Sequence, residues 1–371
     1  MQGVMLVGGL GTRLRPLTIT TPKPMLPIVN TPLLEIELLH LRKFGVDDVI
    51  LSTGYLPSVF DGYFGDGSNI GIKLTYVTED EPLGTCGAVK NVEKHLGSDP
   101  IIVCNGDILT DLDIGALLDY HRQKGSVVTI TLTPVEDPTA YGLVPLDPDG
   151  RIREFLEKPS RDQIVTNLIN AGTYVIDPVV FEQVPPATNY SFERQLFPSL
   201  LEQGVPMYGY PADCYWLDLG TPAKYLAAHH DILNRKIQVD LPGSEVSEGV
   251  VAGGELDADP SSRLQGPLLL GSEVHVGRGS QLGPLSCIGD RVWVGEGADI
   301  EGSVIMEGAV IGDGCRIMQS IVGRNTVLGP RVTVADGSVL GDNIVSGDDN
   351  EFLKGMRIWP STRIQGGGIR F

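Results

Sequence analysis

The sequence lacks any long apolar run and carries little positive charge. No apolar run approaches the roughly 18 residues of a membrane-spanning helix, and Val4–Val7 is too short for the core of a signal peptide. Only 28 Lys and Arg oppose 47 Asp and Glu, a formal charge of −19. Such a chain repels nucleic acid and anionic lipid, because binding to either depends on neutralising phosphates. We therefore expect a cytoplasmic protein with neither nucleic acid nor a membrane as partner, in which any phosphate ligand needs a local basic pocket.

Cysteine is also scarce, with five scattered residues and no CxxC spacing. Disulfide frameworks and zinc sites need cysteines in recognisable sets, so this pattern predicts free thiols in a reducing compartment. Hydrophobic residues make up 42% and charged residues 20% of the 371 positions, which is a globular composition. The length allows two or three domains.

Glycine is abundant but uneven, with 25 of 47 in residues 241–371. Before that point apolar strands alternate with helical stretches, which predicts an α/β domain with a mostly parallel sheet and helices on both faces. We expect strands at Val4–Val7, Val49–Ser52, Ile101–Cys104 and Val127–Leu132, and helices at Pro32–Phe44, Gly84–Leu96, Ile114–Lys124 and Pro222–Asn234. Residues 1–240 would form this domain, and the Pro-, Gly-, Ser- and Glu-rich segment 241–262 would link it to a second domain, 263–371.

The second domain carries a six-residue repeat. Aliphatic residues recur at Leu264, Leu270, Val276, Leu282, Ile288, Val294, Ile300 and Met306, then after a slip of one residue at Ile311 and Ile317, and after another at Val322, Leu328, Val334 and Leu340. In most hexads glycine follows. This period predicts a left-handed parallel β-helix of hexapeptide repeats with the aliphatic side chains inside, in roughly four turns. We expect residues 352–371 to cap its open end.

A glycine-rich loop, Gly8-Gly9-Leu10-Gly11-Thr12-Arg13, follows the first strand, and Pro22-Lys23-Pro24 comes soon after. Glycines let backbone N–H groups approach an anion, which a nearby Arg and Lys can neutralise. The loop is neither a dinucleotide fingerprint, since Leu14 stands where the third Gly is needed, nor a P-loop, since no Gly-Lys-Ser/Thr follows. It predicts a phosphate-binding site.

Six further motifs accompany the loop: Glu81-Pro82-Leu83-Gly84-Thr85-Cys86-Gly87, Asn105-Gly106-Asp107, Tyr141-Gly142, Glu157-Lys158-Pro159, Asn170-Ala171-Gly172 and Trp216-Leu217-Asp218-Leu219-Gly220-Thr221-Pro222. In this order they resemble the signature of the nucleoside-diphosphate-sugar pyrophosphorylases, the sugar-1-phosphate nucleotidylyltransferases, over essentially the whole chain. The resemblance implies a Rossmann-like nucleotidyltransferase domain. It also implies an enzyme that uses Mg²⁺ to join an NTP to a sugar 1-phosphate by in-line attack on the α-phosphorus, releasing pyrophosphate. The residues of the glycine-rich loop and Ile358-Trp359-Pro360 are most similar to those of family members that use GTP and mannose 1-phosphate to make GDP-mannose.

The resemblance also implies roles for individual residues. Arg13 and Lys23 would be catalytic, stabilising the α-phosphate and the leaving pyrophosphate. Nucleotide binding would fall to Leu6, Gly8, Gly9, Gly11, Thr12, Glu79, Gly84 and Thr85, sugar-phosphate binding to Gly142, Glu157, Lys158 and Asn170, and magnesium to Asp107 and Asp218. Magnesium prefers carboxylates, substrate phosphates and water, and a carboxylate at position 79 could accept both adjacent donors of guanine.

Other interpretations remain open. The substrates could instead be glucose 1-phosphate with dTTP, UTP or ATP, or the chain could be a catalytically silent homologue that binds an NDP-sugar and regulates a partner. Hexapeptide solenoids also occur in acyltransferases, for which His275 would be the candidate base. Cys86 departs from the Ala common in the family, which leaves oxidative sensitivity open. We further expect a homo-oligomer, because the flat solenoid sides suit self-association.

Overall fold

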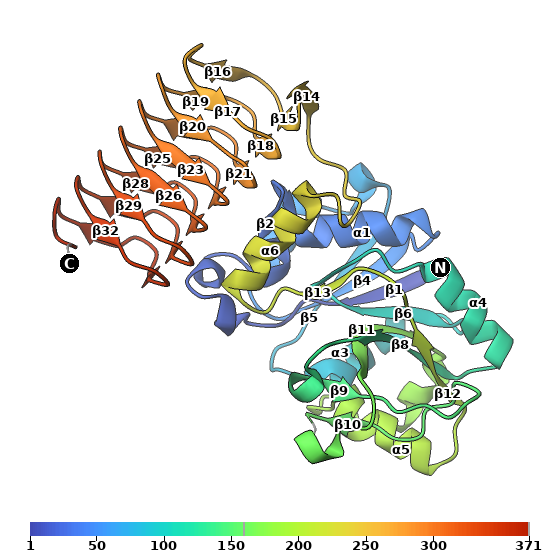
Figure 1. Ribbon diagram of the computed structural model, residues 1–371. Helices are drawn as coiled ribbons and strands as arrows, with labels where there is room; N and C mark the ends of the chain where they lie inside the picture. The colour runs from blue at the N-terminus through green and yellow to red at the C-terminus, as the bar shows by residue number, and fades with distance from the viewer. Residues whose placement is uncertain (159, 370–371) are drawn as a thin grey trace. The chain divides into compact units, whose positions relative to one another are not determined.

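The computed structural model describes residues 1–158 and 160–369 (Figure 1). The chain divides into two compact units. One comprises Met1–Gly9 and Leu34–Trp216, and the other comprises Leu10–Leu33 and Leu217–Phe371. The glycine-rich loop therefore begins in the first unit and continues in the second. The predicted division at residues 241–262 into two functional domains stays a prediction.

The first unit is built on a nine-stranded sheet in the order β10-β9-β11-β6-β1-β4-β5, extended by β8 and β12. Its strands are β1 (Gln2–Leu6), β4 (Asp48–Thr53), β5 (Lys73–Thr78), β6 (Ile101–Asn105), β8 (Val128–Pro134), β9 (Gly142–Leu143), β10 (Leu156–Glu157), β11 (Leu168–Ile176) and β12 (Met207–Pro211). Strands β6, β1, β4 and β5 are parallel neighbours, whereas β11 runs antiparallel to both β6 and β8. The predicted parallel α/β sheet is confirmed for the first four.

Helices pack on this sheet, and Figure 1 shows α1 above it and α3 below. The α-helices are α1 (Leu33–Lys43), α2 (Pro57–Phe64), α3 (Gly84–Val92), α4 (Ile114–Lys124) and α5 (Phe197–Glu202). Short helical turns are η4 (Ser68–Ile70), η5 (Glu93–His95), η6 (Pro138–Ala140), η7 (Arg161–Gln163), η8 (Pro178–Gln183) and η9 (Phe192–Leu196). Helix α4 has the predicted bounds because its ends are encoded locally: Asp113 Oδ1 accepts from the Ala116 N–H at 2.8 Å, and Gly125 ends the helix at φ 55°.

The second unit begins with the rest of the loop. It contains η1 (Thr12–Leu14), η2 (Leu17–Ile19), η3 (Lys23–Met25) and the small hairpin β2 (Pro27–Ile28) and β3 (Thr31–Pro32). Two further short strands are β7 (Ile108–Thr110) in the first unit and β13 (Trp216–Asp218), which reaches the start of the second. Helix α6 (Pro222–Leu233) follows, close to its predicted range.

The solenoid of the second unit has three sheets whose strands pair in parallel. Sheet I contains β15 (Val250–Ala252), β18 (Leu268–Leu270), β21 (Ser286–Ile288), β24 (Val304–Ile305), β27 (Ile321–Val322), β30 (Val339–Leu340) and β33 (Arg357–Ile358), with β14 (Ser244–Ser247) antiparallel at its edge. Sheet II contains β16 (Leu256–Ala258), β19 (Val274–Val276), β22 (Trp293–Val294), β25 (Val310–Ile311), β28 (Val327–Leu328), β31 (Val345–Ser346) and β34 (Arg363–Ile364). Sheet III contains β17 (Arg263–Leu264), β20 (Gln281–Leu282), β23 (Asp299–Glu301), β26 (Arg316–Met318), β29 (Thr333–Val334) and β32 (Glu351–Phe352). This arrangement is the one that hexapeptide repeats predict for a left-handed β-helix.

The inward positions match the predicted repeat with one correction. Ile305, not Met306, lies in register with Ile288 on one side and Val322 on the other, and its side chain is fully buried in the solenoid core. The first slip therefore comes one hexad earlier, after Ile300. Gly302, at φ 57°, lets the chain turn one residue sooner. The sequence pattern could not separate Ile305 from Met306, because both are apolar.

The solenoid is also longer than the roughly four turns predicted. It starts within the expected linker, where β15 pairs with β18 and β16 with β19. It continues through β32–β34 to Ile364, so most of the expected cap is further coil. The Ile369 N–H then donates to Asn350 Oδ1 at 2.8 Å, which fastens the end of the chain to the last turn. None of the helices in the described part of the chain has the length and hydropathy that crossing a membrane requires.

Candidate phosphate-binding site

Glycines and carboxylates follow the carboxyl ends of four parallel strands in the first unit. Gly8 and Gly9 follow β1, Gly54 follows β4, Glu79 follows β5 and Asp107 lies just past β6. A Cβ on Gly8 would lie 3.4 Å from the Gly54 nitrogen and 3.5 Å from Glu79 Oε1, whereas a Cβ on Gly9 would meet nothing within 4 Å. The predicted residues therefore gather at the sheet edge where open α/β sheets bind ligands, with backbone accessible at Gly9.

Glu79 is held in place by its own strand and turn. Its Oε1 accepts from Ser52 Oγ at 3.0 Å, and its Oε2 accepts from the Leu83 N–H at 2.9 Å. An ionised carboxylate offers about four acceptor positions, so each oxygen can still accept from a ligand. The side chain is thus held in one position by contacts within its own unit, which the sequence pattern did not show.

Gly84 and Thr85 contact another part of the first unit. Gly84 has φ 69°, and a Cβ there would lie 2.9 Å from the Tyr190 carbonyl oxygen. Thr85 Oγ1 donates to Glu193 Oε2 at 3.1 Å and accepts from the Phe192 N–H at 3.0 Å. The expected base-binding segment is therefore built against residues 190–193.

Glu193 is a site candidate that sequence reasoning missed. Besides Thr85, it accepts from Ser191 Oγ at 2.7 Å and from the Tyr174 hydroxyl at 3.2 Å, and Asn170 Nδ2 donates to that hydroxyl at 2.8 Å. The network joins Thr85, expected at the nucleotide, to Asn170, expected at the sugar phosphate. In the sequence, Ser191-Phe192-Glu193 indicates only an ordinary helix start, because Tyr174 is nineteen residues away.

The other sugar-phosphate candidates lie on neighbouring strands. Gly142 on β9 pairs with Glu157 on β10, and the next residue of β9, Leu143, pairs with Ile169 on β11, beside Asn170. Lys158 is exposed, at φ 51°, and its N–H donates to the Tyr141 carbonyl at 3.0 Å. The fold thus brings these four residues onto adjacent strand ends. Pro159 of the same motif lies outside the described residues.

In the second unit, cations surround Asp218. Lys23 is 7% exposed and its Nζ lies 3.4 Å from Asp218 Oδ1, while Lys224 Nζ lies 3.7 Å from Oδ2. A Cβ on Gly220 would lie 2.9 Å from Arg13 Nη2 and 3.0 Å from Asp218 Oδ2, so these side chains flank the same glycine. The second unit therefore brings Arg13, Lys23 and Asp218 together.

Lys224 was not predicted, although the sequence held a signal for it. It lies in the first turn of α6, after the N-cap Thr221, whose side chain accepts from the Lys224 N–H. A cation there is unfavourable for the helix dipole.

The two loop residues of this unit that were predicted to bind nucleotide, Gly11 and Thr12, differ in exposure. Thr12 is exposed at the start of η1. Gly11 is packed, with φ 57°, and a Cβ on it would lie only 3.1 Å from Lys23 Cβ. Gly11 thus lets the loop close over Lys23.

The segment from Arg13 to Asn30 lies along the solenoid. Asn30 Nδ2 donates to the Ile288 carbonyl (2.8 Å), Arg324 Nη1 to Thr21 Oγ1 (2.8 Å), Thr20 Oγ1 to Asp342 Oδ2 (2.7 Å), and Arg357 Nη1 to the carbonyls of Arg13 (3.3 Å) and Arg15 (3.1 Å). As the chain is followed back from Asn30 to Arg13, its partners advance along the solenoid from Ile288 to Arg357. The solenoid therefore holds the backbone of the residue expected to be catalytic.

The donors present fit magnesium. Asp107 in the first unit and Asp218 in the second each offer the hard carboxylate oxygens that this ion prefers. Across residues 1–158 and 160–369, no group of three or more His, Cys, Asp or Glu side chains is arranged to hold a metal.

Cys86 is a packing residue in this structure. Its side chain is fully buried, and burial raises the pKa of its thiol to about 12, so little reactive thiolate forms near neutral pH. All five cysteines are free thiols, as predicted, and only Cys214 is partly exposed.

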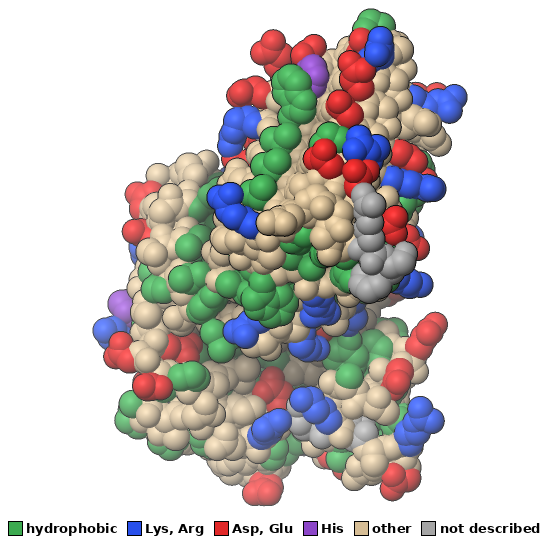
Figure 2. Space-filling model, turned by 90° about the vertical axis from the view of Figure 1, so that its left-hand side faces the viewer, with side chains coloured by type: hydrophobic (Ala, Val, Ile, Leu, Met, Phe, Trp, Pro, Cys, Tyr) green, Lys and Arg blue, Asp and Glu red, His purple; other side chains and the backbone are tan. Residues whose placement is uncertain are grey.

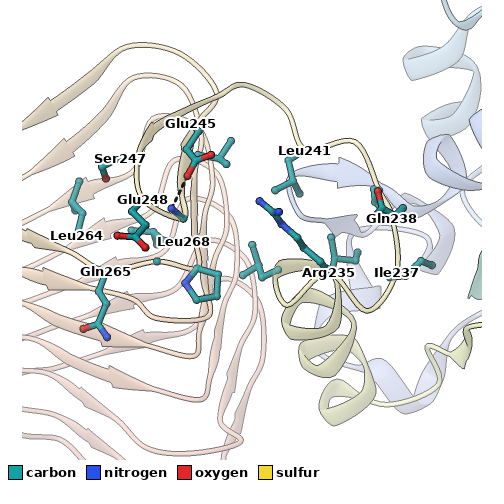
Figure 3. Close-up of a pocket in the computed structure, with 17 residues that line it drawn as sticks. Arg235, Ile237, Gln238, Leu241, Glu245, Ser247, Glu248, Leu264, Gln265 and Leu268 are labelled. Atoms are coloured by element: carbon teal, nitrogen blue, oxygen red, sulfur yellow. Dashed lines mark hydrogen bonds between the residues drawn. The ribbon is translucent and has the colours of Figure 1, made fainter.

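A separate pocket of about 820 Å³ opens between the end of α6 and the first solenoid turns (Figure 3). Arg235, Glu245 and Glu248 are its charged residues, and Glu245 Oε1 accepts from the Gly249 N–H at 2.8 Å. None of the residues predicted for substrate or metal lines it.

A glycine-rich loop and carboxylates at the carboxyl ends of parallel strands are typical of α/β proteins that bind phosphate-bearing nucleotides. The chain belongs to the nucleotidyl transferase family, whose family model matches residues 2–235. Residues 264–367 match the model of a second family, described as GMPPB C-terminal domain. The chain is thus an enzyme of this family, and the resemblance of its motifs is confirmed.

Three similar proteins illustrate the match. Mannose-1-phosphate guanylyltransferase of Mycobacterium tuberculosis is 40% identical over 100% of this chain and 98% of its own. UTP–glucose-1-phosphate uridylyltransferase of Synechocystis is 33% identical over 87% of each chain. The crystal structure of HddC from Yersinia pseudotuberculosis complexed with GMP-PN is 32% identical, with TM-score 0.52, and covers 61% of this chain and 97% of that one.

Proposed function

We propose that the protein transfers the guanylyl group of GTP to mannose 1-phosphate, giving GDP-mannose and pyrophosphate. The observation that carries the chemistry is the cluster of Arg13, Lys23 and Asp218 in the second unit. The choice of substrates is supported by the full-length similarity to a mannose-1-phosphate guanylyltransferase. A biosynthetic enzyme of this kind would act in the cytoplasm.

In this proposal a phosphate oxygen of the sugar 1-phosphate attacks the α-phosphorus of GTP, and pyrophosphate leaves in line. Both reactants are anions, so the protein's task is to position them and to stabilise the growing charge. Arg13 and Lys23 would stabilise the α-phosphate and the departing pyrophosphate. Lys23 is suited to this because its ammonium is buried and already held next to a carboxylate.

Asp107 and Asp218 would hold Mg²⁺, which when bound would neutralise charge on the phosphates. Each assignment rests on that carboxylate's own surroundings and can be tested separately.

The remaining predicted residues would bind the two substrates. Glu79 would accept the two adjacent donors of guanine, and the loop backbone would contact the phosphates. The further nucleotide contacts are Leu6, Gly8, Gly9, Gly11, Thr12, Gly84 and Thr85, and those to the sugar phosphate are Gly142, Glu157, Lys158 and Asn170. Glu193 would support both sets through Thr85 and Tyr174.

The test is Mg²⁺-dependent pyrophosphate release for GTP, ATP, UTP and dTTP, each with mannose 1-phosphate and glucose 1-phosphate. We expect the fastest release from GTP with mannose 1-phosphate. A faster rate with glucose 1-phosphate and another nucleotide would overturn the substrate choice but keep the chemistry. If folded protein released no pyrophosphate with any pair, the proposal would be overturned and a regulatory homologue that binds NDP-sugars would be favoured.

A further inference from the structure

One column of side chains runs along the outer face of sheet II. Its members, one on each strand, are Asp257, His275, Trp293, Val310, Val327, Val345 and Arg363. Each is the direct register partner of the next, so they form a straight ladder. At about 4.8 Å per strand the ladder is roughly 29 Å long.

The middle of this ladder is apolar and exposed. Trp293 is 51% exposed, and Val310 and Val327 are each 37% exposed. Figure 2 shows a row of hydrophobic side chains along the solenoid. Isolated exposed apolar residues are ordinary, but a continuous row on a flat sheet marks an interaction surface. Tryptophan is also enriched at the centres of interfaces.

The ladder is ordered before any partner binds. The rings of His275 and Trp293 stack with their centroids 3.6 Å apart at an interplanar angle of 16°. His275 Nδ1 lies 2.7 Å from Asp257 Oδ2. These contacts hold the indole in place, which lowers the entropy that association would cost. His275 thus lies on a flat outer face, where it supports Trp293.

The charges at the two ends of the ladder indicate which partner fits. Asp257 ends it on one side and Arg363 on the other, and Val310 is the middle of the seven positions. If a second copy packs on this face in the opposite direction, Asp257 lies opposite Arg363, Trp293 opposite Val327, and Val310 opposite itself. A copy in the same direction would place like charges together at both ends, which costs free energy.

We propose that sheet II is the interface of a homodimer, in which two solenoids pack face to face and antiparallel about a two-fold axis through Val310. A two-fold interface requires a surface that is complementary to itself, and this ladder meets that requirement in both apolar content and charge. The proposal gives the expected self-association a defined face. It is independent of the substrates.

The first test places a charge on the axis. In Val310→Glu each dimer would bury two carboxylates against each other, whereas Val246→Glu, the matched control, changes a 53% exposed valine on β14. By sedimentation equilibrium of the full chain at micromolar concentrations, we expect dimers for the parent and Val246→Glu and monomers for Val310→Glu. A monomeric parent, or a Val310→Glu protein that associates like the parent, would overturn the proposal.

The second test determines the relative orientation of the two copies in the dimer. Asp257→Arg and Arg363→Asp should each weaken the dimer at least tenfold, and the double variant should restore it, because opposite charges then meet again at both ends. Arg316→Asp and Glu351→Arg, exposed residues of sheet III, serve as controls and should change nothing. Single variants that dimerise like the parent would refute the antiparallel arrangement.

Discussion

Lys23 and Arg13 occupy different surroundings although they serve one proposed role. Lys23 is buried against Asp218, whereas Arg13 is exposed and its backbone carbonyl is bound by Arg357. An exposed guanidinium can reach an incoming triphosphate. A buried ammonium attracts a nearby phosphate more strongly, because the low dielectric of its surroundings screens the charges less.

Truncating either cation should therefore slow turnover without unfolding the protein. For Arg13→Ala and Lys23→Met we expect kcat to fall by about 10²–10³, as for the loss of one preorganised donor. Arg15→Ala is the control, because the contact of Arg15 with the solenoid uses its carbonyl rather than its side chain. Steady-state pyrophosphate release measures all three, and near-parental kcat in either of the first two variants would remove that residue from the mechanism.

Asp107 and Asp218 should differ from other nearby aspartates in their effect on metal dependence. In Asp107→Asn or Asp218→Asn, a neutral amide replaces the anionic oxygen that magnesium prefers, so the Mg²⁺ concentration for half-maximal rate should rise about tenfold or more. Asp113→Asn is the control, since asparagine caps α4 equally well. A magnesium titration of the rate decides the matter, and an unchanged midpoint would exclude that carboxylate as a ligand.

At the scale of elements, the segment Leu10–Leu33, which contains the second half of the glycine-rich loop, and the solenoid belong to one compact unit. Contacts from Arg324, Asp342 and Arg357 reach residues 13–21, and Asp342 is 6% exposed. A buried carboxylate that accepts from both Thr20 Oγ1 and the Arg324 N–H fixes the docking of these elements. A solenoid that serves only as a scaffold would not need such contacts to the loop.

Removing the Arg357 contacts should therefore loosen the loop. In Arg357→Ala we expect trypsin to cleave after Arg13 several-fold faster and kcat to fall about tenfold, because small displacements of a positioned catalytic group are costly. Arg357→Lys should recover part of both effects, and Arg316→Ala is the control. Because cleavage is followed without substrate, unchanged cleavage in Arg357→Ala would contradict the anchoring role whatever the activity assay shows.

At the scale of the whole molecule, stability should fall in mild acid because of a buried histidine. His229 on α6 is 1% exposed, its Nδ1 accepts from the Val29 N–H at 3.3 Å, and burial lowers its pKa to about 3. The unfolded chain, with an ordinary pKa near 6.5, binds the proton more readily. The contribution of neutral, buried His229 to the free energy of unfolding is therefore complete above pH 6.5 and is lost as the pH falls toward 3. Burial also lowers the pKa values of His40 and His121, which act in the same direction.

His229→Asn isolates this contribution, because an amide oxygen can still accept from Val29 but does not titrate. Between pH 7 and 5.5 the parent should lose about 1 kcal/mol more unfolding free energy than the variant. Denaturant unfolding at the two pH values measures the difference, and equal losses would show that His229 does not titrate on unfolding.

Several features follow from the sequence alone because they depend on neighbours along the chain. The bounds of α4 are set by Asp113 and Gly125, and the solenoid was recognisable from the six-residue period between Leu264 and Leu340. The catalytic and metal candidates were recognisable because each sits in a contiguous motif. The parallel strands that precede Gly8 and Asp107 followed from alternating apolar and helical segments, whereas β5, which precedes Glu79, was not predicted.

Tertiary structure decided what depends on residues far apart in the chain. The partners of Glu193 and of Asp342 lie up to 108 and 322 positions away, so no local spacing could reveal them. The choice of Ile305 over Met306 depended on register with the coils on either side. The ladder from Asp257 to Arg363 exists only because the coils stack in register, and its opposite end charges become complementary only when two such faces meet.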